Sequence, residues 1–240
     1  MDLRHVAGDV FFNGTAFFVD INGRCCLVTC GHVLDLSLSE GKSVFLVSGS
    51  SGEPTSFELF CFDDIIFRDD VLDCCVACVS SEVPMRLGCE VFSIDVGFSL
   101  DDFLEEEGFL FESIDYVFFG LGYPGIGRRV ESSVLIRMSM MGWVLSCQRI
   151  DDCVIVLCEQ NNPELFMFSG LNVRDSGNLG GISGAPVWSG FSKQGPRLVG
   201  YVKQGTDAFG LPSSIVHVSR IDSIVDSLIS SQSWTVLGQD

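Results

Sequence analysis

The sequence predicts an all-β fold, built as a barrel or a sandwich, because its composition and its patterning agree. Hydrophobic residues make up 47% of the 240 residues and charged residues only 19%, which supplies a packed interior. The apolar segments are short, rich in Val, Ile and Phe, and separated by Gly, Ser, Asn or Asp. The length fits one compact unit or two small fused halves.

Each candidate strand is an apolar run bounded by turn residues. The candidates are residues 15–19, 24–29, 43–47, 74–79, 117–119, 134–138, 153–158, 185–188 and 198–203. One helix is expected near the C-terminus, where apolar residues recur at intervals of three and four: Ile221, Ile224, Val225, Leu228 and Ile229. The sequence Ser219-x-x-Asp222 is expected to cap its start.

The middle of the chain departs from the strand pattern. Between Phe98 and Phe111 the sequence SLDDFLEEEGFLF is acidic and has some helical periodicity. We interpret this stretch as the crossing between two halves, with a solvated charged loop inside one half as the alternative.

The charge balance bears on partners. Fourteen Lys and Arg against 32 Asp and Glu give a formal net charge of −18, which repels phosphate backbones and argues against a nucleic-acid partner. A basic substrate or partner would be attracted, although an acidic surface also serves solubility.

The sequence also predicts a cytoplasmic protein with no membrane partner. The start, MDLRHVAGDVFF, has no secretory-signal pattern, and no apolar run reaches the roughly 18 residues of a membrane span. The 11 cysteines are expected to be reduced and to pack as small hydrophobes. Cys75-x-x-Cys78 has metal-ligand spacing, but on a strand these side chains face opposite sides, so no metal site is predicted.

His32 is the histidine with the context of a general base. It follows an apolar strand in Thr29-Cys30-Gly31-His32-Val33, where small residues would deliver the ring to a strand end. A base must come within hydrogen-bond distance of a nucleophile while staying next to open space. A structural histidine at the edge of the core is the alternative.

Ser183 lies in the strongest local motif, Gly180-Gly181-Ile182-Ser183-Gly184-Ala185-Pro186-Val187. Glycine lets a backbone approach a ligand closely. The amides of Gly181 and Ser183 could then point together at an oxygen that becomes negative during acyl transfer. An ordinary turn is the alternative.

A carboxylate would complete a triad by orienting the histidine. Asp73, directly before the apolar run 74–79, is the preferred candidate. Asp69 and Asp70 are the runners-up, and each of the three could also be a surface turn residue.

Thr-Cys-Gly-His-Val, Leu-Asp before an apolar strand, and Gly-Ile-Ser-Gly-Ala-Pro-Val resemble, in this order, the signature segments of trypsin-like peptidases of the chymotrypsin clan. Residues 14–19, GTAFFV, resemble the strand that opens the intracellular and bacterial members. The resemblance implies two six-stranded antiparallel barrels with a closing helix. It divides the chain into an N-terminal barrel (1–97), an acidic connection (98–114) and a C-terminal barrel with the helix (115–240).

The resemblance implies a serine endopeptidase that works through an acyl-enzyme with a triad of His32, Asp73 and Ser183. The oxyanion hole would be formed by Gly181 and Ser183, and the substrate would lie along Tyr201, Val202 and Lys203. No metal or cofactor is implied. The expected partners are a protein or peptide substrate and a regulatory protein, and the alternative function is a catalytically silent module that binds peptides.

Two departures from the family limit what the resemblance carries. Secreted members have an Asp directly before the serine, where this chain has Ile182, so activation by removal of a propeptide is not supported. Gly177 stands at the position that sets primary specificity in digestive members. Cleavage specificity is therefore not transferred.

Overall fold

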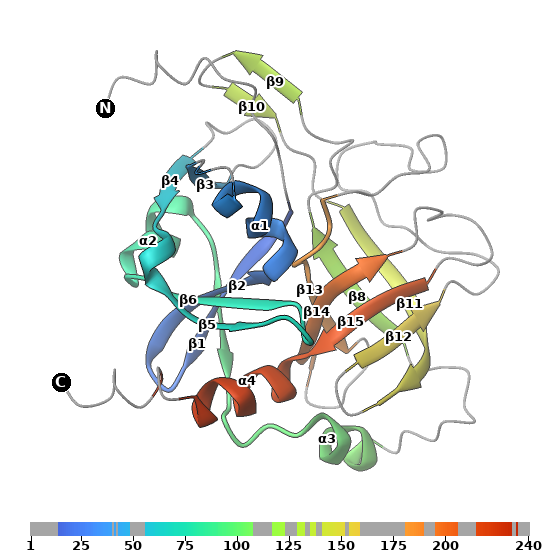
Figure 1. Cartoon of the computed structure of the whole chain (residues 1–240). Helices are drawn as coiled ribbons and strands as arrows, with labels where there is room; N and C mark the ends of the chain where they lie inside the picture. The colour runs from blue at the N-terminus through green and yellow to red at the C-terminus, as the bar shows by residue number, and fades with distance from the viewer. Residues whose placement is uncertain are drawn as a thin grey trace.

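A computed structural model describes residues 14–39, 41, 43–48, 56–107, 117–122, 129–132, 135–137, 141–151, 154–158, 181–189, 195–205, 215–231 and 234. The protein is mostly β-sheet with a helix, α4 (Ile221–Ser230), near the C-terminus, as the sequence predicts. Figure 1 shows two β-rich halves side by side, with α4 below the strands. Shorter helices are α1 (Gly31–Ser39), α2 (Glu82–Leu87) and α3 (Leu100–Glu106).

The N-terminal half is built on a five-stranded sheet with the order β5-β6-β2-β1-β7. Its strands are β1 (Ala16–Ile21), β2 (Arg24–Cys30), β5 (Ile65–Asp69), β6 (Cys74–Cys78) and β7 (Val91–Ile94). The pairings are antiparallel except for β7, which runs parallel to β1. Strands β3 (Val44–Ser48) and β4 (Ser56–Phe60) pair only with each other in the described part of the chain. This half therefore differs from the six-stranded barrel that was expected.

The C-terminal half contains a closed barrel with the order β11-β12-β15-β14-β13-β8. Its strands are β8 (Val117–Gly122), β11 (Met141–Ile150), β12 (Val154–Cys158), β13 (Pro186–Ser189), β14 (Leu198–Gly205) and β15 (Ile215–Arg220). Strands β9 (Arg129–Ser132) and β10 (Leu135–Arg137) form a separate pair. All barrel pairings are antiparallel, so side chains alternate between its interior and its outer face.

One apolar cluster joins the N-terminal sheet to α4. The inner residues of β1, β2 and β6 are buried in it together with the apolar stripe of the helix, formed by Ile221, Ile224, Val225 and Leu228. The stripe repeats at intervals of three and four residues, as the sequence predicts. Tyr201 of β14 lies in the same cluster, so the two halves share part of their interior.

The start of α4 corrects the expected cap. Ser219 lies in β15, and its hydroxyl donates to Leu72 O at 2.7 Å instead of capping the helix. The N-cap residue is Arg220, whose side chain makes no capping bond. Asp222 accepts hydrogen bonds from Arg220 and from the amide of Leu100, the first residue of α3. The motif was wrong as a cap because its residues bind other elements.

Only part of the acidic stretch is helical in the described residues. Helix α3 begins after Ser99, whose hydroxyl accepts from the amide of Asp102 at 3.2 Å and caps the helix. The division at residues 97 and 114 stays a prediction.

Of the residues described, none belongs to a helix that is both long and apolar enough to span a membrane.

Several cysteines lie in the core as free thiols, including Cys26, Cys30, Cys74 and Cys75. Burial raises the pKa of Cys26 to about 12 and that of Cys75 to about 11. Thiols with such values stay protonated and pack as hydrophobes.

Candidate active site

His32 is positioned by the junction of β2 and α1. Cys30, the last residue of β2, pairs with Cys74, the first residue of β6, so the residues that flank these two ends meet. The amide of Gly31 donates to Asp73 O at 3.1 Å. Helix α1 then starts at Gly31 and presents the His32 side chain, 48% of which is exposed. The histidine is therefore at the surface and not in the core.

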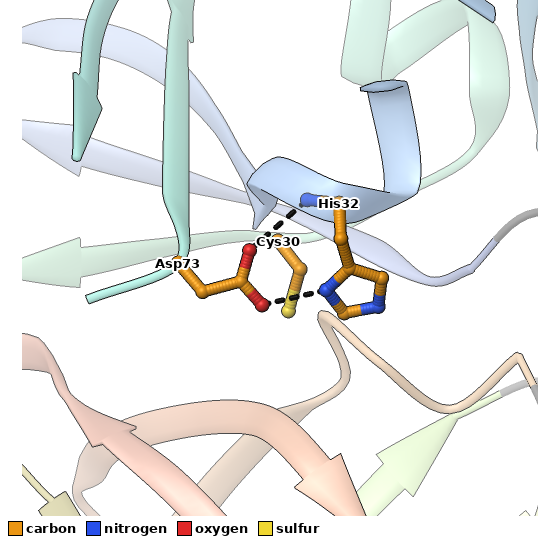
Figure 2. A group of neighbouring side chains, drawn as sticks. All are labelled: Cys30, His32 and Asp73. Carbon is orange, nitrogen blue, oxygen red and sulfur yellow. Dashed lines mark hydrogen bonds and ion pairs between the residues drawn. The ribbon is translucent and has the colours of Figure 1, made fainter. Parts of the chain in front are cut away.

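Asp73 contacts His32 through both of its carboxylate oxygens. His32 Nδ1 lies 2.6 Å from Asp73 Oδ2, and the backbone amide of His32 donates to Asp73 Oδ1 at 3.0 Å, as Figure 2 shows. The amide is one of those at the start of α1 that have no partner inside the helix. One carboxylate thus fixes both the ring and the backbone of the histidine.

The two groups shift each other's protonation. The hydrogen bond from Asp73 raises the pKa of His32 above 6.5, against the opposing effect of partial burial. Partial burial acts to raise the pKa of Asp73, but the hydrogen bonds from the ring and amide of His32 outweigh it and leave that pKa lowered. The pair therefore favours an ionised Asp73 and a more basic imidazole.

The other candidate carboxylates bond elsewhere. Asp69 Oδ1 accepts from the amides of Val71 and Leu72, each at 2.8 Å, and shapes the turn before Asp73. Asp70 is an exposed partner of Arg68. Asp73 itself has a φ of +52°, in the left-handed region that non-glycine residues seldom adopt.

Ser183 lies in a turn between two glycines with positive φ, Gly181 at +101° and Gly184 at +85°. The turn is closed by a 2.8 Å hydrogen bond from the amide of Ala185 to Ile182 O. Thr15, which directly precedes β1 in the other half of the molecule, binds this turn through two hydrogen bonds. The Thr15 amide donates to Ser183 O at 2.8 Å, and the Thr15 hydroxyl donates to Gly181 O at 2.9 Å.

Two further contacts bring the Ser183 turn to the His32 junction. Val202 O accepts from the amide of Gly184 at 2.8 Å and from the thiol of Cys30 at 3.1 Å. A Cβ placed on Gly14 would lie 2.9 Å from Ser183 O and 2.5 Å from the side chain of Val33. The serine turn and the neighbours of His32 in sequence are therefore linked through two shared residues, Val202 and Gly14. Both residues are described, and no hydrogen bond joins Ser183 Oγ to the His32 ring.

The side chains of the predicted substrate strand point into the protein. Tyr201 and Val202 are 0% exposed, and Lys203 Nζ donates to Val71 O at 2.5 Å. The substrate role of Tyr201, Val202 and Lys203 stays a prediction, but the side chains of Tyr201 and Val202 are too buried to contact a substrate themselves. Any contact with this part of β14 would run through the backbone or through the half-buried Lys203.

Cys30, His32 and Asp73 also form a cluster of metal-ligand types, with ligand atoms within 4.8 Å of one another (Figure 2). Its chemistry does not fit a metal centre. His32 Nδ1 and Asp73 Oδ2 are only 2.6 Å apart and already bonded to each other. The Cys30 thiol also has a partner of its own, because its Sγ donates to Val202 O at 3.1 Å.

Sequence reasoning did not assign the residues that support the turns of Ser183 and Asp73, and it named Tyr201 only as a substrate contact. Thr15, Tyr201 and Ser219 donate hydrogen bonds to backbone carbonyls, and a donor to a distant carbonyl leaves no spacing pattern in the sequence. Gly177 and Gly180 lie outside the described residues.

No protein-family model matches the chain, and no curated protein matches it. Two similar solved structures come from Sesbania mosaic virus. One is the serine protease domain of the viral polyprotein, at 15% identity and a TM-score of 0.48, covering 91% of this chain and 87% of that one. The other comes from work on the coupled folding and binding of the disordered VPg protein, at 16% identity and a TM-score of 0.49, covering 92% and 85%.

Proposed function

We propose that this chain is a trypsin-like serine endopeptidase with a triad of His32, Asp73 and Ser183. The observation that carries the proposal is the 2.6 Å contact between His32 Nδ1 and Asp73 Oδ2. A carboxylate on Nδ1 holds the proton there and leaves Nε2 free to act as the base. The exposed ring and the nearby glycine-flanked serine supply the two other parts that such a mechanism needs.

In the proposed reaction, Ser183 Oγ attacks the carbonyl carbon of a peptide bond while its proton passes to His32 Nε2. The C–N bond then breaks, and His32 returns the proton to the leaving amine. Water then attacks the acyl carbon while its proton passes to His32, the C–O bond to Ser183 breaks, and His32 returns the proton to Ser183 Oγ. Asp73 stays ionised throughout and stabilises the imidazolium that forms in each half of the reaction.

The proposed oxyanion hole consists of the amides of Gly181 and Ser183. The φ of +101° at Gly181 is one that glycine adopts without strain, and it lets this backbone turn toward a bound carbonyl oxygen. Loss of one such donor typically costs 10²–10³-fold in rate, so the position of the turn matters as much as the serine itself.

The proposed substrate is a protein or a peptide, and the mechanism needs no metal or cofactor. The formal charge of −18 favours a substrate or regulatory partner that is basic. A cytoplasmic location belongs to the same proposal.

A fluorophosphonate probe tests the proposal, because it reacts only with an activated serine. We expect the wild-type protein to be labelled and both Ser183→Ala and His32→Ala to remain unlabelled. The matched controls are Ser93→Ala, an exposed serine on β7, and His217→Ala on β15, both of which should label like the wild type. A folded wild-type protein that takes up no probe, either alone or after addition of a regulatory protein, would contradict the proposal.

A second candidate is a catalytically silent fold that binds a peptide. It is favoured by the lack of a hydrogen bond between Ser183 Oγ and His32 in this arrangement of two described residues. Apo peptidases often have long catalytic contacts that tighten only with substrate. Labelling that appears only after addition of a regulatory protein would identify a latent peptidase instead of a silent one.

A further inference from the structure

The turn that carries Asp73 is bound from the opposite half of the molecule. Three successive carbonyl oxygens accept hydrogen bonds from side chains of the C-terminal barrel. These bonds join Lys203 Nζ to Val71 O at 2.5 Å, Tyr201 Oη to Leu72 O at 3.0 Å and to Asp73 O at 3.1 Å, and Ser219 Oγ to Leu72 O at 2.7 Å.

The strand pairing of the barrel brings these three donors to one face. Tyr201 of β14 lies directly opposite Ser219 of β15, so their side chains project to the same side of the sheet. Lys203 follows two residues later in β14, at a bulge where it has no partner in the pairing with β15. Residues two apart in a strand project to the same face, so Lys203 lies on the face of Tyr201. The bulge changes the direction of the Lys203 side chain, which reaches Val71 O.

The turn needs support from outside. Asp73 adopts a φ of +52°, and a non-glycine residue stays in that region only when its surroundings hold it there. Tyr201 and Ser219 are 0% exposed, and a buried hydroxyl is costly unless it is hydrogen-bonded. Both hydroxyls bond to carbonyl oxygens of this turn. The conformation of Asp73 therefore depends on Tyr201 and Ser219, and the two buried hydroxyls depend on the turn for their hydrogen bonds.

We propose that Tyr201, Ser219 and Lys203 are positioning residues that fix the Asp73 carboxylate against His32 by binding the backbone of its turn. They act on the backbone, because none of the four hydrogen bonds reaches the carboxylate itself. Their effect on rate rests on the proposed peptidase function, whereas their effect on the His32–Asp73 pair does not.

Other charges near the pair must stay constant in a test. Asp35 of α1 acts with Asp73 to raise the pKa of His32, and Arg68 of β5 binds Asp35. The Lys203 cation lowers the pKa of Asp73 directly. Lys203 is therefore a poor first variant, and the uncharged hydroxyls of Tyr201 and Ser219 are the ones to remove.

The experiment is an NMR titration of His32 in the full chain labelled with ¹³C-histidine, with the signal assigned by its loss in His32→Ala. Wild type is compared with Tyr201→Phe and with Tyr201→Phe/Ser219→Ala. The control is Ser189→Ala, which removes a buried hydroxyl that bonds Arg197 N in the same barrel and does not contact the Asp73 turn. We expect the pKa of His32 to fall toward 6.5 in Tyr201→Phe and further in the double variant, and to be unchanged in the control.

An unchanged His32 pKa in a folded Tyr201→Phe protein would overturn the proposal, even if its thermal midpoint dropped as in Ser189→Ala. Tyr201→Phe keeps the ring and its packing, so it gives an answer if the double variant does not fold. In an active enzyme, we also expect kcat to fall about 10- to 100-fold with KM unchanged, because a misplaced triad slows chemistry more than binding. A His32 pKa that depends on Tyr201 in a protein that takes up no probe would support the positioning role and contradict only the peptidase function.

Discussion

At the scale of single residues, protonation of His32 couples activity and stability with opposite signs. The proposed base is the neutral imidazole, and Asp73 raises the pKa of His32 above 6.5. The fraction of active base therefore grows only as the pH rises through this raised value. The stabilising interaction with Asp73 is complete below 6.5, the unfolded value, and is lost as the pH rises through the folded pKa.

In Asp73→Asn, a neutral amide replaces the carboxylate that raises the pKa of His32. We expect the acid limb of the probe-labelling rate, above pH 6.5 in the wild type, to move down toward that value. The maximal rate should fall on the order of 10⁴-fold, since the favoured tautomer is lost. Labelling rates across the pH range measure both effects.

The matched control is Asp70→Asn, whose side chain is 88% exposed and bonds Arg68. This variant should keep the wild-type profile. Equal acid limbs in Asp73→Asn and in the wild type would show that Asp73 does not set the basicity of His32.

The contact between His32 and Asp73 was predictable, because each stands at the end of an apolar strand and sequence motifs mark such positions. Asp73 was preferred to Asp69 and Asp70 because it directly precedes the apolar run 74–79, but all three stayed open as turn residues. The pairing of Cys30 with Cys74 decides among them, since it sets which turn residue meets the start of α1. The register of this pairing depends on both strands of the sheet, so the residues around Asp73 alone do not predict it.

At the scale of elements, Gly184 is the tightest point of the serine turn. A Cβ on this residue would lie 2.0 Å from Thr15 O and 2.8 Å from Thr29 Oγ1. Both atoms are fixed, because the Thr29 hydroxyl itself donates to Thr15 O at 2.8 Å. The turn and strand β1 therefore approach closely only because the side chain is absent.

We expect Gly184→Ala to abolish probe labelling and to lower the thermal midpoint strongly, since backbone must move to admit the methyl group. The control is Gly23→Ala, which shares a positive φ, +77°, but has no atom within 4 Å of the added Cβ. It should cost only the backbone strain, about 1–2 kcal/mol, and keep full labelling. Equal midpoints for the two variants would show that crowding at Gly184 is not what holds the turn.

Strands that consist of a continuous apolar run were predicted well, whereas several strands that mix apolar and polar residues were missed. Strands β1, β2, β6, β13 and β14 lie within a residue or two of their expected bounds. The missed strands include β5, β7 and β15. In β7 exposed residues alternate with partly or fully buried ones, so it has no continuous apolar run, and β15 runs directly into α4 without a turn signal. The capping motif failed because tertiary contacts of Ser219 and Asp222 outweighed it.

At the scale of the whole molecule, each half holds the proposed catalytic residue of the other. Thr15 of the N-terminal sheet binds the turn of Ser183, and Tyr201 and Ser219 of the barrel bind the turn of Asp73. A displacement between the halves would disturb both turns at once. The resemblance between short motifs indicates which residues react, but these reciprocal contacts depend on the completed fold.

Helix α3, in the acidic stretch, is held against the start of α4 by a buried arginine. Arg220 is 4% exposed and bonds Asp222 at 2.7 Å, Asp101 of α3 at 2.9 Å and the carbonyl oxygen of Asp151 at 2.9 Å. Asp222 is 7% exposed and also accepts the amide of Leu100. Burial acts to raise the pKa of Asp222, but its bonds to Arg220 and to backbone amides outweigh this and leave the pKa lowered.

We expect Arg220→Ala to lower the free energy of unfolding by about 3–5 kcal/mol, because it leaves the Asp222 carboxylate buried without its cation. The pH dependence follows from the lowered pKa of Asp222. Its contribution to stability is present above 3.8, the unfolded value, and is lost as the pH falls through the lower folded value. Urea unfolding at neutral and acidic pH should show the free energies of unfolding of the variant and the wild type converging as the pH falls.

The control Arg86→Ala removes an exposed arginine that pairs with Glu58 and Glu82, and little change in the free energy of unfolding is expected there. A gap between Arg220→Ala and wild type that persists unchanged into acid would show that the arginine stabilises the contact between α3 and α4 by packing and not through its charge.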